Sequence, residues 1–410
     1  MPRRTPPTRL KEAPFTGARG NDDDIYDIED SGQPQAKNPS SPEYYETLKD
    51  TIHLAAKNGD KETLQKTIND LKHQEQIVRK VQQNKNIKID QKKFGETPLH
   101  ASCENGNEEI VKLLLEKNSK INVLDSLRET PLHKASRENH IGTALILLKD
   151  ENIKINLQNS SKETALHIAC ANNFENLAQS LIVNGADIAI KDEENRTALH
   201  LACKAGSTRI VKLLLDRGAN IDELGGKLNQ TPLHIAVENG HLDIVKLLLE
   251  RGAEIDKLGP FDQTALHVAV KNKKTDITEL LLDAGANIDA KNKLGFTPLY
   301  NAVRTKELGM IKLLLDRGAD IEIKDLSGES ALDLVEKNLK SENPSPELQK
   351  IKQLFDERQK FEASLILKTL SEDSLKITST SSVKTSSTLR ALSIDLLMSL
   401  NTNDRSFGVD

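Results

Sequence analysis

The sequence predicts an all-α solenoid, a stack of small helical layers, on the basis of three observations. A motif Thr-Pro/Ala-Leu-His recurs every 33 or 34 residues along the middle of the chain. Each copy is followed by a leucine-rich segment of helical length. Only 3% of residues are aromatic and Trp is absent, which suits thin layers built on Leu, Ile and Ala. A period of this size indicates a supersecondary unit copied in tandem, in which each copy buries its apolar face against its neighbours.

The first helix of each unit begins at the motif. Its threonine can accept a hydrogen bond from a free amide of the first turn, and in four copies the next residue is Pro, which is favoured there. In the copy after Asn195, His200 stands at the third helical position and can reach back to Thr197, while Gly206 ends the helix. Seven threonines start such units, the last with Tyr in place of His: Thr97, Thr130, Thr164, Thr197, Thr231, Thr264 and Thr297.

The second helix of the same unit contains the apolar run Ile210, Val211, Leu213, Leu214 and Leu215. These residues are too dense for a one-sided helix, so we expect burial between neighbouring repeats. Gly218 predicts a left-handed stop. Residues 219–230 must then return to the next threonine as an extended segment, here called the finger.

This pattern of helix, turn, helix and finger resembles the ankyrin repeat, whose signature includes Thr-Pro-Leu-His-x-Ala. Seven copies are in phase, and Gly-Ala-Asp/Asn/Glu-Ile closes four of them, at Gly185, Gly252, Gly285 and Gly318. The resemblance implies an ankyrin-like stack with extended hairpin fingers. It also implies a partner-binding surface on the finger tips and on the exposed part of the first helices, which line the concave side.

Five segments are predicted along the chain. They are a disordered acidic and Pro-containing tail (1–44), an atypical N-terminal capping repeat with a long second helix (45–96), seven ankyrin-like repeats (97–329), a degenerate C-terminal repeat with a capping helix (330–370) and a Ser/Thr-rich tail with a short amphipathic segment (371–410). Atypical end units are expected because the outermost faces must meet water.

The end segments leave alternatives open. Leu348, Ile351, Leu354, Phe355 and Phe361 recur at helical spacing and predict a cap, with a partner-binding helix as the alternative. Residues 389–400 could form a recognition helix, a membrane-surface helix or an export signal. Tyr26 lies in an acidic run and could be phosphorylated or could dock a partner, although a solvated tail explains it as well.

Composition excludes several classes of protein. The net charge of −5 predicts no nucleic-acid partner. No apolar run approaches the ~18 residues of a membrane span, and no signal peptide is visible, so we expect a cytoplasmic protein. We also expect it to be a monomer. Three cysteines at one position of the repeat predict reduced, buried thiols. The abundance of Lys, Asn and Ile suggests an intracellular bacterium, from which delivery into a host cytosol would need a route independent of a signal peptide.

No residue set predicts catalysis, a metal site or a cofactor. Six histidines belong to the repeated motif, and successive copies lie too far apart to share a zinc ion bound at ~2 Å per ligand. Metalloprotease, nucleophile-elbow and kinase motifs do not occur. Gly225-Gly226-Lys227 is followed by Leu228 and so lacks the hydroxyl that a phosphate-binding loop needs.

The predicted function is therefore a non-catalytic scaffold that binds a protein partner. The alternative is an effector exported into a host cell, whose C-terminal tail carries a delivery or membrane-surface signal. Large apolar residues at the finger tips and charged residues on the first helices are the candidates for binding, with packing against the neighbouring finger as the alternative role of a tip. The candidates are Phe94, Leu127, Leu228, Phe261, Leu294, Phe296, Arg137, Lys204, Lys271 and Arg304.

Overall fold

The computed structural model describes residues 42–70, 95–341 and 345–378. The chain divides into two compact units, Met1–Glu46 and Thr47–Asp410, and the repeats lie in the second. Tyr26, Phe94, residues 389–400 and most of the predicted tails (1–41 and 379–410) fall outside the described residues, whereas residues 42–44 and 371–378 of those tails are helical. Of the predicted long second helix of the first repeat, residues 61–70 are described and are helical.

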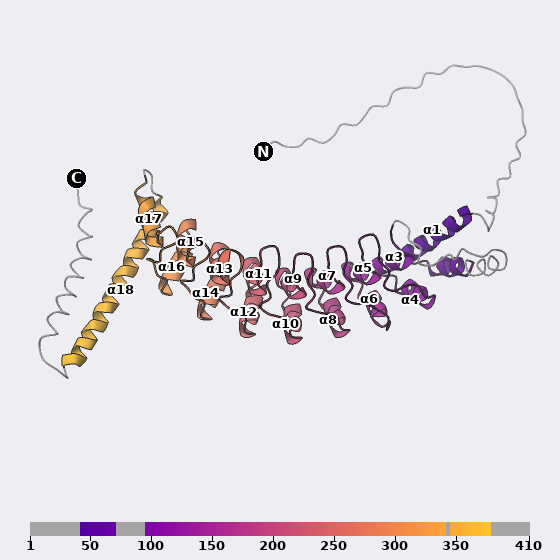
Figure 1. The fold of residues 1–410 in the computed structure, drawn as a ribbon, viewed down its shortest axis with the longest axis horizontal. Helices are drawn as coiled ribbons and strands as arrows, with labels where there is room; N and C mark the ends of the chain where they lie inside the picture. Colours follow the sequence, from indigo (N-terminus) through magenta and orange to yellow (C-terminus); the bar gives the residue numbers. More distant parts are fainter. Residues whose placement is uncertain (1–41, 71–94, 342–344, 379–410) are drawn as a thin grey trace, which may run out of the picture. The chain divides into compact units, whose positions relative to one another are not determined.

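Helices provide the regular structure of the described residues (Figure 1). The first helices of the units are α1 (Pro42–Asn58), α3 (Pro98–Glu104), α5 (Pro131–Arg137), α7 (Ala165–Ala171), α9 (Ala198–Ala205), α11 (Pro232–Asn239), α13 (Ala265–Lys271), α15 (Pro298–Thr305) and α17 (Ala331–Leu339). The second helices are α4 (Glu108–Glu116), α6 (Ile141–Leu148), α8 (Glu175–Val183), α10 (Thr208–Asp216), α12 (Leu242–Glu250), α14 (Thr275–Asp283) and α16 (Leu308–Asp316), and α18 (Pro346–Thr378) follows α17.

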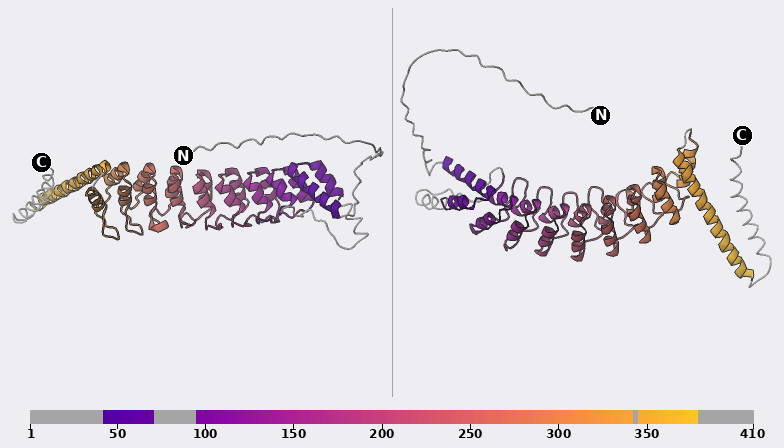
Figure 2. Two further views of the ribbon diagram at one scale, coloured as in Figure 1. Left: turned by 90° about the horizontal axis from the view of Figure 1, so that it is seen from above. Right: turned by 180° about the vertical axis from the view of Figure 1, so that it is seen from behind.

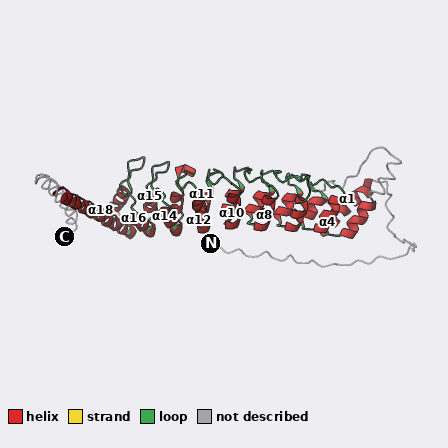
Figure 3. Cartoon of the chain, turned by 90° about the horizontal axis from the view of Figure 1, so that it is seen from below, coloured by secondary structure: helices red, strands yellow, loops and turns green. Residues whose placement is uncertain are grey.

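Within the second unit the helices stack in chain order. Each first helix from α3 to α17 contacts the next first helix, and the second helices from α4 to α14 do the same. Figure 2 shows this succession of layers from two further sides. The fingers form a row along one edge of the helices (Figure 3), so residues at equivalent positions of successive fingers are neighbours in space.

The start of each first helix is fixed by the predicted capping residues. In α9 the side chain of Thr197 caps the third helical position, and the His200 side chain returns to the Thr197 backbone. In α17, Ser330 and Asp333 make the same reciprocal contact without a histidine. Asn139 and Asn173 adopt the left-handed backbone that Gly206 adopts in its unit, so both substitutions keep the turn.

The second helices differ from the expectation in one respect. In α10, Ile210, Val211 and Leu214 are buried, whereas Leu213 and Leu215 are only half-buried. The apolar residues that face the neighbouring repeats are thus buried as expected, whereas the other two lie toward the outer face of the helix, at the surface of the stack.

Helix α18 packs against α16 and α17. Leu348, Ile351 and Phe355 are buried in this contact, as a capping helix requires. Phe361 is 57% exposed, contrary to its predicted place on the apolar face. The helix continues to Thr378, beyond the boundary expected at residue 370. None of the described helices is long and apolar enough to cross a lipid bilayer.

Candidate protein-binding surface

Five of the seven fingers that are described in full share one device that holds the tip. An Asp or Asn five residues before the helix cap accepts two backbone amides of its own finger. In the first example, Asp125 Oδ1 accepts the amides of Leu127 at 2.8 Å and Glu129 at 2.7 Å. The equivalent residues in the other fingers are Asn159, Asp192, Asn292 and Asp325.

Two adjacent fingers lack this acceptor because glycine replaces it, as Gly226 and Gly259. The first closes through an isolated antiparallel bridge between Gly225 and Gln230. The second closes through a tight turn in which the Gln263 amide donates to the Pro260 carbonyl at 3.1 Å. Within that turn Phe261 adopts φ 57° and ψ 31°, a left-handed conformation that is unusual for a bulky side chain. The strained backbone places an aromatic ring at the finger tip.

Backbone hydrogen bonds join neighbouring fingers. The amide of Ser160 donates to the carbonyl of Leu127 at 2.9 Å, and that of Lys293 donates to the carbonyl of Phe261 at 2.9 Å. Pro260 stands at the equivalent donor position and has no N–H, so it cannot bind the carbonyl of Leu228 in this way. The finger that carries Leu228 is therefore not joined to the following finger by this backbone hydrogen bond.

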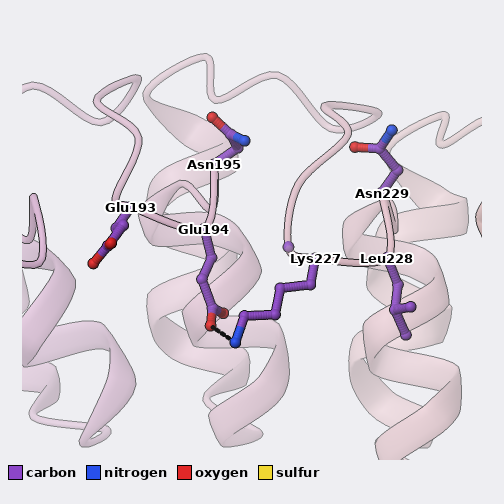
Figure 4. A pocket seen from close by; sticks show the side chains of 7 residues that line it. Glu193, Glu194, Asn195, Lys227, Leu228 and Asn229 are labelled. Carbon is purple, nitrogen blue, oxygen red and sulfur yellow. Dashed lines mark ion pairs between the residues drawn. The ribbon is translucent and has the colours of Figure 1, made fainter.

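A shallow depression lies between two fingers at this place (Figure 4). The ion pair between Glu194 and Lys227, at 3.2 Å, crosses it. The lining is mainly polar, and Leu228 is its one large apolar residue. This composition suits contact with a polypeptide better than enclosure of an apolar small molecule.

The predicted finger-tip residues are exposed. Leu127, Leu228, Phe261 and Leu294 are 58%, 50%, 68% and 56% exposed, respectively. At Leu127, Phe261 and Leu294 the backbone carbonyl bonds to the next finger while the side chain remains in solvent. The alternative in which each tip side chain packs away against the next finger does not describe these four residues.

Phe296 differs from the tip residues. It is half-buried and stacks on Tyr300, with ring centroids 4.3 Å apart. The guanidinium of Arg304 lies 5.5 Å from the Phe296 ring centroid. Of these two candidates, Phe296 supports the first helix and Arg304 stays exposed above it.

The contact between Phe296 and Arg304 belongs to a recurring pair that sequence reasoning missed. The residue before the helix cap meets the exposed residue near the end of the same first helix. The pair is Glu129 with Arg137, Gln230 with Glu238, and Glu329 with Lys337 in three other units. Finger bases and first helices therefore form one continuous surface.

Lys204 and Lys271 occupy the helix position of this pair and are exposed. Their counterparts before the cap are Arg196 and Gln263, which carry no negative charge. Within the described part of the chain neither lysine has a carboxylate partner. Arg137, by contrast, is paired with Glu129. The predicted cations thus differ in how available they are to a partner.

Sequence reasoning also missed a buried charge cluster. Lys134 is 7% exposed and lies 2.7 Å from Glu96, 3.3 Å from Asp125, 3.5 Å from Glu129 and 3.9 Å from Glu104. Burial alone would lower the pKa of Lys134, but the carboxylates, Glu96 first, raise it above its usual value. The lysine itself could have indicated the cluster from the sequence, since most other copies have an apolar residue at this position.

The six motif histidines are structural, because both ring nitrogens are engaged within the stack. Among the described residues no group of three or more His, Cys, Asp or Glu side chains is arranged to hold a metal ion. Cys103, Cys170 and Cys203 are buried free thiols, and burial raises the pKa of each above its usual value. A protonated, inaccessible thiol is a poor nucleophile.

Comparison with known proteins identifies the family. A model described as ankyrin repeats (3 copies) matches residues 52–159, 166–259 and 256–325, which is more than half of the chain. The chain therefore belongs to the ankyrin repeat family, whose repeats generally serve as protein–protein interaction modules. Among solved structures it is similar to the ankyrin repeat domain of Bcl-3, described as a unique member of the IkappaB protein family. That match has 30% identity and a TM-score of 0.47, and it covers 50% of this chain and 94% of the other.

Proposed function

We propose that this protein is a non-catalytic scaffold that binds a protein partner on the surface formed by its finger tips and first helices. The observation that carries the proposal is the row of exposed apolar tips at Leu228, Phe261 and Leu294. Each tip is held on a hydrogen-bonded finger, so a partner would pay little entropy to order it. Apolar side chains surrounded by charge are typical of recognition surfaces.

The site of action that fits this role is the cytosol, with the protein as a monomer. The three buried free thiols are compatible with a reducing compartment. The effector alternative depends on residues 389–400, which lie outside the described residues, and no structural observation favours it.

The proposal is tested by affinity capture with the full chain, followed by mass spectrometry, in parallel with two variants. The triple variant Leu228→Ala, Phe261→Ala, Leu294→Ala removes the tips, while Leu242→Ala removes an exposed leucine of α12. We expect a partner that the unchanged chain and the Leu242→Ala variant retain and the triple variant loses. Equal capture by all three proteins would overturn the proposed surface.

A further inference from the structure

The finger and first-helix surface changes character along the array. The residue before the helix cap is acidic in three successive units, as Glu96, Glu129 and Glu163. In the next four units it is Arg196, Gln230, Gln263 and Phe296. The acidic part also contains the exposed Glu138 and Glu193. The position before the helix cap is therefore acidic in the first three units, where Leu127 is the one exposed apolar tip among the described residues, uncharged or basic in the next four, and acidic again at Glu329.

Exposed cations accompany the apolar tips in the C-terminal part. Lys271 lies on the first helix α13, Lys293 on the next finger and Arg304 on α15, and all three are exposed. Within the described ranges none of them has a carboxylate partner. Near the tips, the acidic residues of the same stretch are Glu238, which accepts a hydrogen bond from Gln230, and Asp262. Glu254, Asp256 and Asp289 stand at the start of the fingers, where the chain leaves the second helices. This part of the surface is thus apolar and basic, and complementary to an acidic chain that carries apolar side chains.

The spacing of the tips restricts the conformation of such a chain. Leu228, Phe261 and Leu294 are separated by 33 residues each, so one tip belongs to each layer. The first helices of successive layers are in contact, which sets the layer spacing at about 8–10 Å. A polyproline II helix has three residues per turn and a rise of ~3.1 Å per residue, so every third side chain points the same way about 9 Å further on. In a β-strand, side chains three residues apart point to opposite faces.

We propose that the surface formed by Leu228, Phe261, Leu294, Lys271, Lys293 and Arg304 binds an extended, polyproline II-like segment of a partner protein. That segment carries an apolar side chain at every third position and acidic side chains between them. The apolar side chains lie in register with the tips, and the acidic ones meet the cations. This inference rests on the proposed function and specifies the chemistry and the period of the partner.

Synthetic peptides test the period and the charge separately. The probe is fluorescein-labelled (Leu-Glu-Pro)4, measured by fluorescence anisotropy with the full chain. One control, (Leu-Leu-Glu-Glu-Pro-Pro)2, has the same composition without the period, and the other, (Leu-Lys-Pro)4, has the opposite charge. We expect the probe to bind at least tenfold more tightly than either control, and to weaken as salt is raised.

Two charge-reversal variants locate the binding. Lys271→Glu with Lys293→Glu should weaken the probe at least tenfold, whereas Lys246→Glu with Lys312→Glu, on exposed positions of α12 and α16, should leave its affinity unchanged. Equal binding of the two acidic peptides, no binding of the probe, or equal effects of the two variants would overturn this inference. The proposed function is decided independently, by whether the tip variant loses a captured partner. If the tip variant lost its partner and the probe did not bind, this inference would be overturned and the proposed function would stand.

Discussion

The imidazole of His133 donates from Nε2 to the carbonyl of Glu163, 30 residues further along the chain, at 3.0 Å. Its Nδ1 accepts the backbone amide of Thr130 at 3.1 Å. An amide can only donate, so Nδ1 is unprotonated and the ring is neutral. All six motif histidines reach a carbonyl of the following finger in this way. Each ring therefore caps its own helix and ties one layer to the next.

This arrangement predicts that the array loses stability as the pH falls from 7.5 to 5.5. Burial lowers the pKa of all six histidines below the unfolded value of about 6.5. The folded state then binds fewer protons than the unfolded state, so its stability is greatest above pH ~6.5 and declines below it. Urea unfolding at the two pH values should give a lower midpoint at pH 5.5. An equal or higher midpoint would show that the rings are not held neutral.

The charge cluster around Lys134 predicts a large effect from a single substitution. Lys134→Ala leaves the buried Asp125 and Glu129 without their shared ammonium group, although both keep other hydrogen bonds. We expect a loss of about 3 kcal/mol in the free energy of unfolding, measured in urea, near the lower end for breaking a buried pair. Lys204→Ala removes an exposed lysine of the next but one unit and should change stability by less than about 0.5 kcal/mol. Similar losses in the two variants would contradict the cluster's role.

The sequence predicted what depends on local and periodic features. The caps at Thr197 and its equivalents, the orientation of His200 and the exposure of Leu228 and Phe261 all follow from a motif repeated in phase. The helical pattern places Phe361 on the buried face of the capping helix, but it does not reveal where the neighbouring helices end, and Phe361 is exposed. Phe296 is a candidate from the sequence because it lies near a tip, and its stacking on Tyr300 of the following helix is a contact that the repeat pattern does not reveal. The surroundings of Lys134 involve carboxylates from two fingers and a helix, and no spacing rule brings these together.

The layer assignment is tested by a substitution in the interior. Leu199 is 1% exposed within α9, so Leu199→Ala should open a cavity and lower the free energy of unfolding by about 2–5 kcal/mol. Leu258→Ala deletes the same atoms at an exposed finger position and should lower the free energy of unfolding by less than about 0.5 kcal/mol. Both values come from urea unfolding of the full chain. An unchanged midpoint for the Leu199 variant would refute its place between the layers.

Two phenylalanines of α18 allow a matched test of the capping helix. Phe355 is fully buried, and Phe355→Ala should cost about 3–5 kcal/mol. Phe361 is exposed, and its ring contacts the guanidinium of Arg358, which lies 5.8 Å from the ring centroid. We therefore expect Phe361→Ala to lower the free energy of unfolding by less than about 1 kcal/mol. Thermal and urea unfolding of both variants would measure the difference. Equal costs would mean that α18 does not cap the stack through Phe355.

The strained turn at Phe261 predicts that stability and binding change in opposite directions. A left-handed residue at the first central position of a tight hairpin turn favours Asn, so Phe261→Asn should raise the free energy of unfolding by about 1 kcal/mol. The same change removes an exposed ring and should weaken capture of a partner. Phe261→Ala removes the ring without relieving the backbone, so it should weaken capture with no gain in stability. Urea unfolding and capture assays on both variants separate these effects. If the Asn variant gained stability and kept its partner, the strain at Phe261 would have no function in recognition.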